Sequence, residues 1–124
     1  MNTRFNNQPK LELMKEDSGG RAYFKLLEDF TLNINEVTIT VPKFFTTDFA
    51  SVPRILWSIF PPVGNYSSAA LIHDYLYTRK ANCPRLLADA IFNCAMQALE
   101  VSWWRRNALY ITVRIFGRFA FRGR

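Results

Sequence analysis

The sequence predicts an α+β fold that is mostly helical, with a small antiparallel sheet near the N-terminus. Two strand-like runs occur early, at 22–27 and 32–41, and a long connection rich in Phe, Pro and Gly follows at 43–65. The remainder is helix-like. With 124 residues, 49% of them hydrophobic, the chain has the size and apolar content of a single domain, 1–124, that folds without disulfides.

The N-terminal part is expected to be a polar arm followed by a β-hairpin. Residues 1–20 are polar and end in the sequence DSGG, which favours a turn. The run at 32–41, LNINEVTITV, has alternating apolar residues, so one of its faces can pack on a core. The acidic pair Glu28 and Asp29 separates it from the first run. The two runs are therefore expected to form an antiparallel hairpin over 22–41.

The connection at 43–65 and the helices that follow it make up the rest of the domain. A structureless stretch of this length in a small domain is more often functional than not. Three helices are predicted, at 66–80, 84–99 and 102–121. Pro84 suits the first turn of the second helix. The short turn at 80–83 makes the first two helices antiparallel neighbours.

A buried carboxylate is the first candidate for a functional group. At helical spacing Asp89 falls inside the apolar stripe of its helix, where an unpaired charge is costly, so it needs a partner. His73 on the preceding helix is the obvious candidate, and Tyr77 and Arg85 compete with it. A buried Asp–His pair would fix the imidazole tautomer and make the ring a better base. A local salt bridge between Asp89 and Arg85 is the plainer alternative.

Three further residues could complete such a site. Asp48, in the sequence TDFASVP, could add a carboxylate beside Asp74, and two carboxylates with loop carbonyls form an oxygen cage for Ca²⁺. Ser51 could act as a nucleophile only if it lay next to His73. Each residue also has a plainer interpretation: His73 as a hydrogen-bonded structural side chain, and Asp48 and Ser51 as turn residues.

Two motifs carry a family resemblance. TDFASVP followed by AALIHDYLY, with ADAIFNCAM and ALYITVRIFG further on, resembles a family of unknown function carried by tailed bacteriophages and prophages. The resemblance covers about residues 22–117. It implies a viral or prophage origin and brings no established activity.

A second resemblance has more chemical content. The prokaryotic secreted phospholipases A2 have a loop that ends in Pro, then a helix with a His-Asp pair and a Tyr, then a helix with an Asp before a Phe. The similar segments here are DFASVP at 48–53, HDYLY at 73–77 and DAIF at 89–92. The loop glycine and cysteine of those enzymes are replaced by Phe49 and Ala50, and their disulfides are absent.

The second resemblance implies a phospholipase A2-like helix pair and a set of roles. His73 would activate water and Asp89 would orient the ring, with Tyr77 beside them as a further catalytic residue. Asp74, with loop groups near Asp48, would hold Ca²⁺. The metal would polarise the ester carbonyl and stabilise the oxyanion.

The net charge of +6 is concentrated at one end of the chain. Residues 1–104 contain ten basic and ten acidic side chains, whereas 105–124 contain six arginines and no acid. The helix at 102–121 is amphipathic, and its apolar face is expected to close the core with the arginines solvated. The alternative is an interfacial helix that lies on anionic lipid. An acidic protein surface also suits this end, and a nucleic acid suits it less well because no base-stacking aromatics accompany the arginines.

Two functions of different classes remain open. The favoured one is a non-catalytic phage protein, either virion- or tail-associated or host-interacting, with a phage or host protein as its partner. The alternative is a calcium-dependent lipid or ester hydrolase used in phage entry or lysis. The sequence has no signal peptide and no apolar run long enough to span a bilayer, so the host bacterial cytoplasm or the assembled virion is the expected location.

Overall fold

The computed structural model describes residues 2–16, 22–48 and 67–121. The chain divides into two compact units, unit 1 (Met1–Asp48) and unit 2 (Phe49–Arg124). The described part of unit 1 contains the strands, and that of unit 2 contains the helices. The predicted α+β class is therefore confirmed. Within the described ranges, no helix has the length and apolar character needed to cross a membrane.

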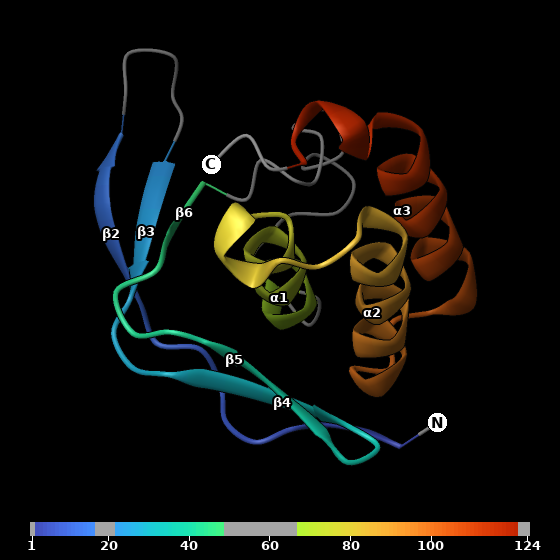
Figure 1. Cartoon of the computed structure of the whole chain (residues 1–124), viewed down its shortest axis with the longest axis horizontal. Coiled ribbons are helices and arrows are strands. Elements are labelled where there is room, and N and C mark those ends of the chain that lie inside the picture. The colour runs from blue at the N-terminus through green and yellow to red at the C-terminus, as the bar shows by residue number, and fades with distance from the viewer. Residues whose placement is uncertain (1, 17–21, 49–66, 122–124) are drawn as a thin grey trace. The chain divides into compact units, whose positions relative to one another are not determined.

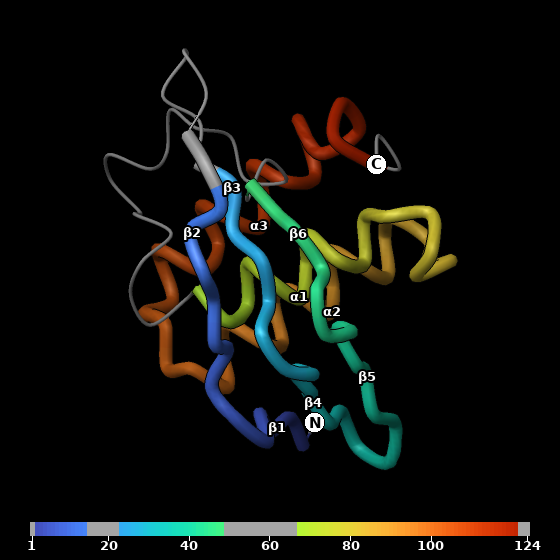
Figure 2. Tube along the Cα trace, turned by 90° about the vertical axis from the view of Figure 1, so that its left-hand side faces the viewer, coloured from blue at the N-terminus to red at the C-terminus, as the bar shows by residue number. Residues whose placement is uncertain are grey.

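The strands of unit 1 form two small antiparallel sheets. In the described residues the strands are β1 (Thr3–Phe5), β2 (Leu11–Glu16), β3 (Ala22–Leu26), β4 (Phe30–Ile34), β5 (Val37–Val41) and β6 (Thr46–Thr47). One sheet has the order β1-β4-β5 and the other has the order β2-β3-β6. Figure 2 shows β2, β3 and β6 side by side, with β3 in the middle.

The predicted hairpin between the runs at 22–27 and 32–41 is wrong. β3 pairs with β2 and β6, and the second run lies in a hairpin of its own, in which β4 pairs with β5. Asn35 in the turn has a φ of 54°, in the left-handed region that Asn tolerates better than most residues. A turn at Asn35 and Glu36 therefore interrupts the alternation of apolar residues. This residue pair is not a strong turn signal, so the turn was not predicted from the sequence.

The first twenty residues, expected to be a loose polar arm, contain β1 and β2. Two of their apolar side chains, Phe5 and Leu11, lie against residues of later strands of unit 1. The ring of Phe5 stacks on that of the fully buried Phe30, with centroids 5.5 Å apart, and Leu11 lies opposite the buried Leu26. Local polarity concealed these strands because their stability comes from pairing with strands later in the chain.

Unit 2 contains the three predicted helices, with shorter ends. They are α1 (Ser67–Leu76), α2 (Arg85–Ala98) and α3 (Trp103–Phe116), with 3₁₀ turns η2 (Arg79–Ala81) and η3 (Gly117–Phe119). Figure 1 shows α2 between α1 and α3, and α2 contacts both. Of the long connection at 43–65, the described part carries β6, and residues 49–65 lie outside the described residues. Cys83 and Cys94 form no disulfide with each other.

The core of unit 2 lies along α1, α2 and one side of α3. Its largest fully buried apolar side chains are Leu71, Ile72, Phe92, Met96, Leu109 and Val113. The expectation that the apolar face of the C-terminal helix closes the core is only partly correct. Ile115, Phe116 and Phe119 are each more than half exposed, because α3 packs against α2 along the narrow side that carries Leu109 and Val113.

Candidate functional site

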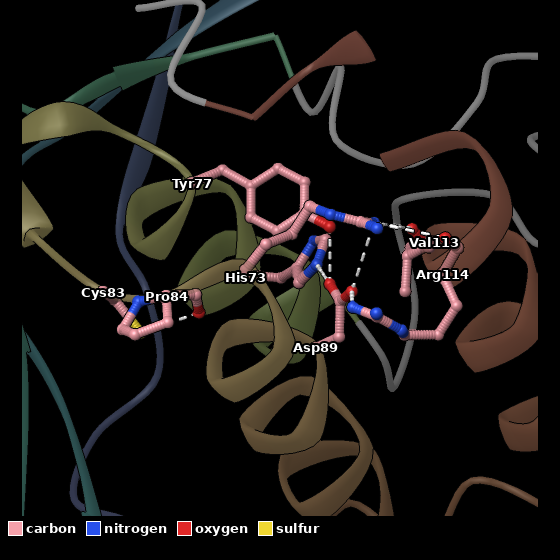
Figure 3. Close-up of polar contacts among 8 residues, drawn as sticks. His73, Tyr77, Cys83, Pro84, Asp89, Val113 and Arg114 are labelled. Carbon is pink, nitrogen blue, oxygen red and sulfur yellow. Dashed lines mark hydrogen bonds and ion pairs between the residues drawn. The ribbon is translucent and has the colours of Figure 1, made fainter. Parts of the chain in front are cut away.

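Asp89 on α2 is the centre of a cluster of polar side chains, here called the Asp89 cluster (Asp89, His73, Tyr77, Arg85 and Arg114). Its Oδ1 lies 2.7 Å from His73 Nε2 and accepts a 2.5 Å hydrogen bond from the Tyr77 hydroxyl. Its Oδ2 accepts a 2.7 Å hydrogen bond from Arg114 Nη1 and lies 3.6 Å from Arg85 Nη1. Figure 3 shows His73, Tyr77 and Arg114 converging on the Asp89 carboxylate.

Local sequence explains how these side chains come together. His73 and Tyr77 are four residues apart, so they share one side of α1 and its continuation, where the Tyr77 N–H donates to the His73 carbonyl. Asn82 then takes a left-handed conformation (φ 49°), which turns the chain before α2. Pro84 has no backbone N–H to donate to a preceding turn, and it occupies the N-cap position of α2. Asp89 consequently lies in the second turn of α2, within reach of His73.

The Asp89 carboxylate is fully buried and fully paired. Its side chain is 0% exposed, and burial alone would raise its pKa. The hydrogen bonds from His73, Tyr77 and Arg114 outweigh burial and hold the pKa below its ordinary value of 3.8. Asp89 is therefore ionised at neutral pH, and its negative charge lies beside the guanidinium of Arg114.

The neighbouring imidazole is neutral. His73 is also 0% exposed, and burial lowers its pKa below 6.5 although the hydrogen bond and charge of Asp89 act in the opposite direction. A neutral ring beside an ionised carboxylate donates to it, so the proton is on Nε2 and Nδ1 carries the lone pair. Among the described residues Nδ1 has no hydrogen-bond partner. The cluster thus holds a neutral imidazole with its basic nitrogen unused.

Tyr77 supports the carboxylate from the other side of Oδ1. Burial and the hydrogen bond to Asp89 raise the pKa of the phenol above its ordinary value of 10.0, so the hydroxyl remains a donor. The Tyr77 ring lies 4.1 Å from that of His73, centroid to centroid, and the ring of Phe92 lies 4.6 Å from it. Two aromatic rings therefore hold the imidazole in place.

Gly117 leaves room for the Tyr77 hydroxyl. A Cβ at Gly117 would collide with that oxygen and would lie 3.1 Å from the Tyr77 ring carbon that carries it. Gly117→Ala is therefore expected to lower the free energy of unfolding by about 1–3 kcal/mol, as overpacking usually does. Urea denaturation of both proteins measures the difference.

The control for this change is the same substitution in a Tyr77→Phe background. Without the hydroxyl, the atom nearest to the new methyl group is gone, and Gly117→Ala should cost clearly less. An equal cost in the two backgrounds would show that the hydroxyl is not what Gly117 accommodates.

Three further site residues, Asp74, Asp48 and Ser51, were predicted from the sequence. Asp74 is a buried residue of α1, and Asp48 is a buried residue at the end of unit 1. Ser51 lies outside the described residues. Within the described part of the chain, no three His, Cys, Asp or Glu side chains come together as metal ligands. The predicted pairing of Asp89 with His73 is observed, and the Arg85 alternative is a longer contact to the other carboxylate oxygen.

Sequence reasoning missed Arg114, which it placed among the solvated arginines of the C-terminal helix. Its guanidinium instead makes the closest ion pair with Asp89. Arg85 donates to the carbonyls of Val113 and Arg114 in the last turn of α3, and the Val113 carbonyl also accepts from the Gly117 N–H. The sequence indicated only that a buried carboxylate requires a cationic partner. It did not indicate which arginine would be that partner.

Comparison with curated proteins and with solved structures gives no match. A family model described as "Protein of unknown function (DUF1353)" matches residues 24–113. This span contains the strands from β4 to β6, the helices α1 and α2, and four members of the Asp89 cluster. The chain therefore belongs to the DUF1353 family of proteins of unknown function.

Proposed function

We propose that this chain is a small ester hydrolase in which His73 is the general base and Asp89 orients it. One observation carries the proposal: Nε2 of a neutral imidazole is bonded to an ionised carboxylate, while the buried Nδ1 has no partner among the described residues. A buried polar atom without a partner is uncommon in native proteins and calls for a specific explanation. A base held ready for an incoming proton is such an explanation.

The reaction follows from the tautomer. Nδ1 of His73 accepts a proton from a water molecule, whose oxygen attacks the carbonyl carbon of the ester. Asp89 stabilises the resulting imidazolium through Nε2, as a carboxylate does for a catalytic histidine. The tetrahedral intermediate then collapses, the bond to the leaving alcohol breaks, and the imidazolium returns its proton to the leaving oxygen. Tyr77 and Arg114 keep Asp89 ionised and in place.

Calcium is a separate part of the proposal. Among the described residues, no three His, Cys, Asp or Glu side chains cluster as a calcium cage usually requires. The hydrolytic reaction is therefore assigned to the protein's own groups. The similarity of the 48–53, 73–77 and 89–92 segments to phospholipases A2 supports Asp48 and Asp74 as ligands. The phage-like motifs support a viral or prophage origin, and a lipid or related ester met during entry or lysis as the substrate.

The test compares the wild type with His73→Asn on two probes, mixed phospholipid vesicles and a soluble p-nitrophenyl ester, with and without calcium. The variant is expected to lose hydrolysis by about 10²–10⁴-fold, the usual contribution of a general base. Lys80→Ala, which alters an exposed residue of the same unit, should keep wild-type activity. A thermal melt of each protein separates loss of activity from loss of fold.

A second function is favoured by a different observation. Asp89 links α1, α2 and α3 through three side chains, and His73 is 0% exposed. Both features suit a non-catalytic accessory protein, tail-associated or host-interacting, in which the cluster only fastens the helices together. Failure of the wild type to hydrolyse either probe, combined with a strongly destabilised His73→Asn, would replace the hydrolase with this accessory role.

A further inference from the structure

The helix α3 presents a second apolar row to solvent, on the side away from its buried residues. Its members, here called the outer stripe, are spaced so that they follow one line along α3 and into η3. They are 56, 55, 56 and 74% exposed, in the order Trp104, Ile111, Ile115 and Phe119. Leu109 and Val113, which are buried, fall on the opposite side of the helix.

The outer stripe does not contribute to the core of unit 2. Single exposed apolar side chains are ordinary, but a continuous exposed row of large ones marks a surface that meets something apolar. Trp103 at the start of α3, 71% exposed, and Phe116 near its end, 51% exposed, are further exposed aromatic side chains of the same helix. A helix that needed only to close the core would carry polar residues at these positions.

Positive charge borders the outer stripe. At helical spacing Arg105 and Arg118 fall on opposite sides of it, and both are exposed. The guanidinium of Arg105 lies 5.2 Å from the centre of the Trp104 ring, and that of Arg118 lies 4.9 Å from the centre of the Phe119 ring. The chain has no acidic residue after Glu100. The partner must therefore be apolar along its middle and anionic at its edges.

We propose that α3 docks on an anionic lipid bilayer. The outer stripe would enter the boundary between head groups and acyl chains, where Trp and Phe are favoured, and the arginines would meet lipid phosphates. A nucleic acid would satisfy the arginines and leave the isoleucines in water. A second copy of the chain would cover the isoleucines and bring arginines of like charge together. Of these three partners, the bilayer is the one that satisfies both halves of this surface.

This inference goes beyond the proposed hydrolysis and does not depend on it, because a docking helix requires no reaction at His73. The two proposals can fail separately. Binding is measured without turnover, and a soluble ester tests the reaction without a bilayer.

The experiment is co-sedimentation of the full chain with vesicles of phosphatidylcholine alone and of phosphatidylcholine mixed with phosphatidylglycerol. Two variants address the two halves of the surface: Ile111→Ser with Ile115→Ser, and Arg105→Glu with Arg118→Glu. The control for the first is Val37→Ser, an exposed residue of β5. The control for the second is Lys43→Glu with Lys80→Glu, which changes the net charge equally at exposed positions outside α3.

We expect binding to the anionic vesicles and at least about tenfold weaker binding for each stripe variant, while the controls stay within about threefold of the wild type. Thermal melts should be unchanged, because the substituted side chains are exposed. Equal losses in the charge control would overturn the assignment to α3. Binding to duplex DNA but not to vesicles, or a dimer that the isoleucine changes dissociate, would overturn the lipid partner.

Discussion

Asp89→Ala is expected to lower the free energy of unfolding by about 3–5 kcal/mol, a large part of the stability of a domain of this size. The carboxylate is 0% exposed and accepts from His73, Tyr77 and Arg114. Removing it leaves the buried donors of His73 and Tyr77, and the partly buried guanidinium of Arg114, without their acceptor. Urea denaturation at neutral pH measures the loss.

A matched control is Glu12→Ala, which removes a carboxylate from an exposed position of β2 and should change stability by no more than about 0.5 kcal/mol. The cause of the loss is identified by Arg114→Ala, made alone and together with Asp89→Ala. Because both changes break one ion pair, the second should cost less once the first is present. A loss below about 1 kcal/mol for Asp89→Ala would show that the cluster is not held as tightly as its geometry requires.

The stability of the protein should also fall as the pH is lowered through 6.5. Burial lowers the pKa of His73 in the folded state, so between the folded pKa and the ordinary histidine pKa of 6.5 the unfolded chain binds more protons than the folded one. Stability is therefore full above pH 6.5 and is lost below it, by up to about 1.4 kcal/mol per pH unit. Asp89, whose pKa is also lowered, loses its contribution only as the pH falls below 3.8.

The chain suits this measurement because it contains one histidine. Urea denaturation at a series of pH values should show the slope in the wild type and lose it in His73→Gln, whatever the stability of the variant at pH 7. The nitrogen chemical shifts of the single imidazole should report the Nε2–H tautomer at neutral pH. A ring that titrates at or above 6.5 would contradict the assigned neutral state.

The elements of unit 2 were more predictable than those of unit 1. Periodicity located α1, α2 and α3, because helical bonds and apolar spacing are local properties of the sequence. Strand pairing is not local. The partner of β3 in β6 and the partner of β4 in β1 depend on segments that are distant in sequence, and the Asn35 turn was hidden inside an alternating run. The predicted hairpin failed for this reason.

The sequence was sufficient to predict the buried carboxylate of the site and its first partner. Asp89 stood out because a carboxylate inside an apolar stripe demands a partner, and helix order made His73 the first choice. The participation of Arg114 depends on which side of α3 faces α2. The pattern of apolar residues along α3 does not determine that side, because apolar residues occur on more than one side of the helix. The unused Nδ1 follows from which nitrogen faces Asp89, and the sequence contains no information on that.

The order in which the chain is synthesised gives the Arg114–Asp89 ion pair a further consequence. Chains fold as they emerge from the ribosome, N-terminal part first. Asp89 is made 25 residues before Arg114, so α1 and α2 can meet while the carboxylate still lacks its closest cation. A pair of α1 and α2 without α3 would have to leave Asp89 accessible to water, because α3 supplies the Arg114 guanidinium. The interior between the first two helices can therefore become dry only once α3 has packed against α2.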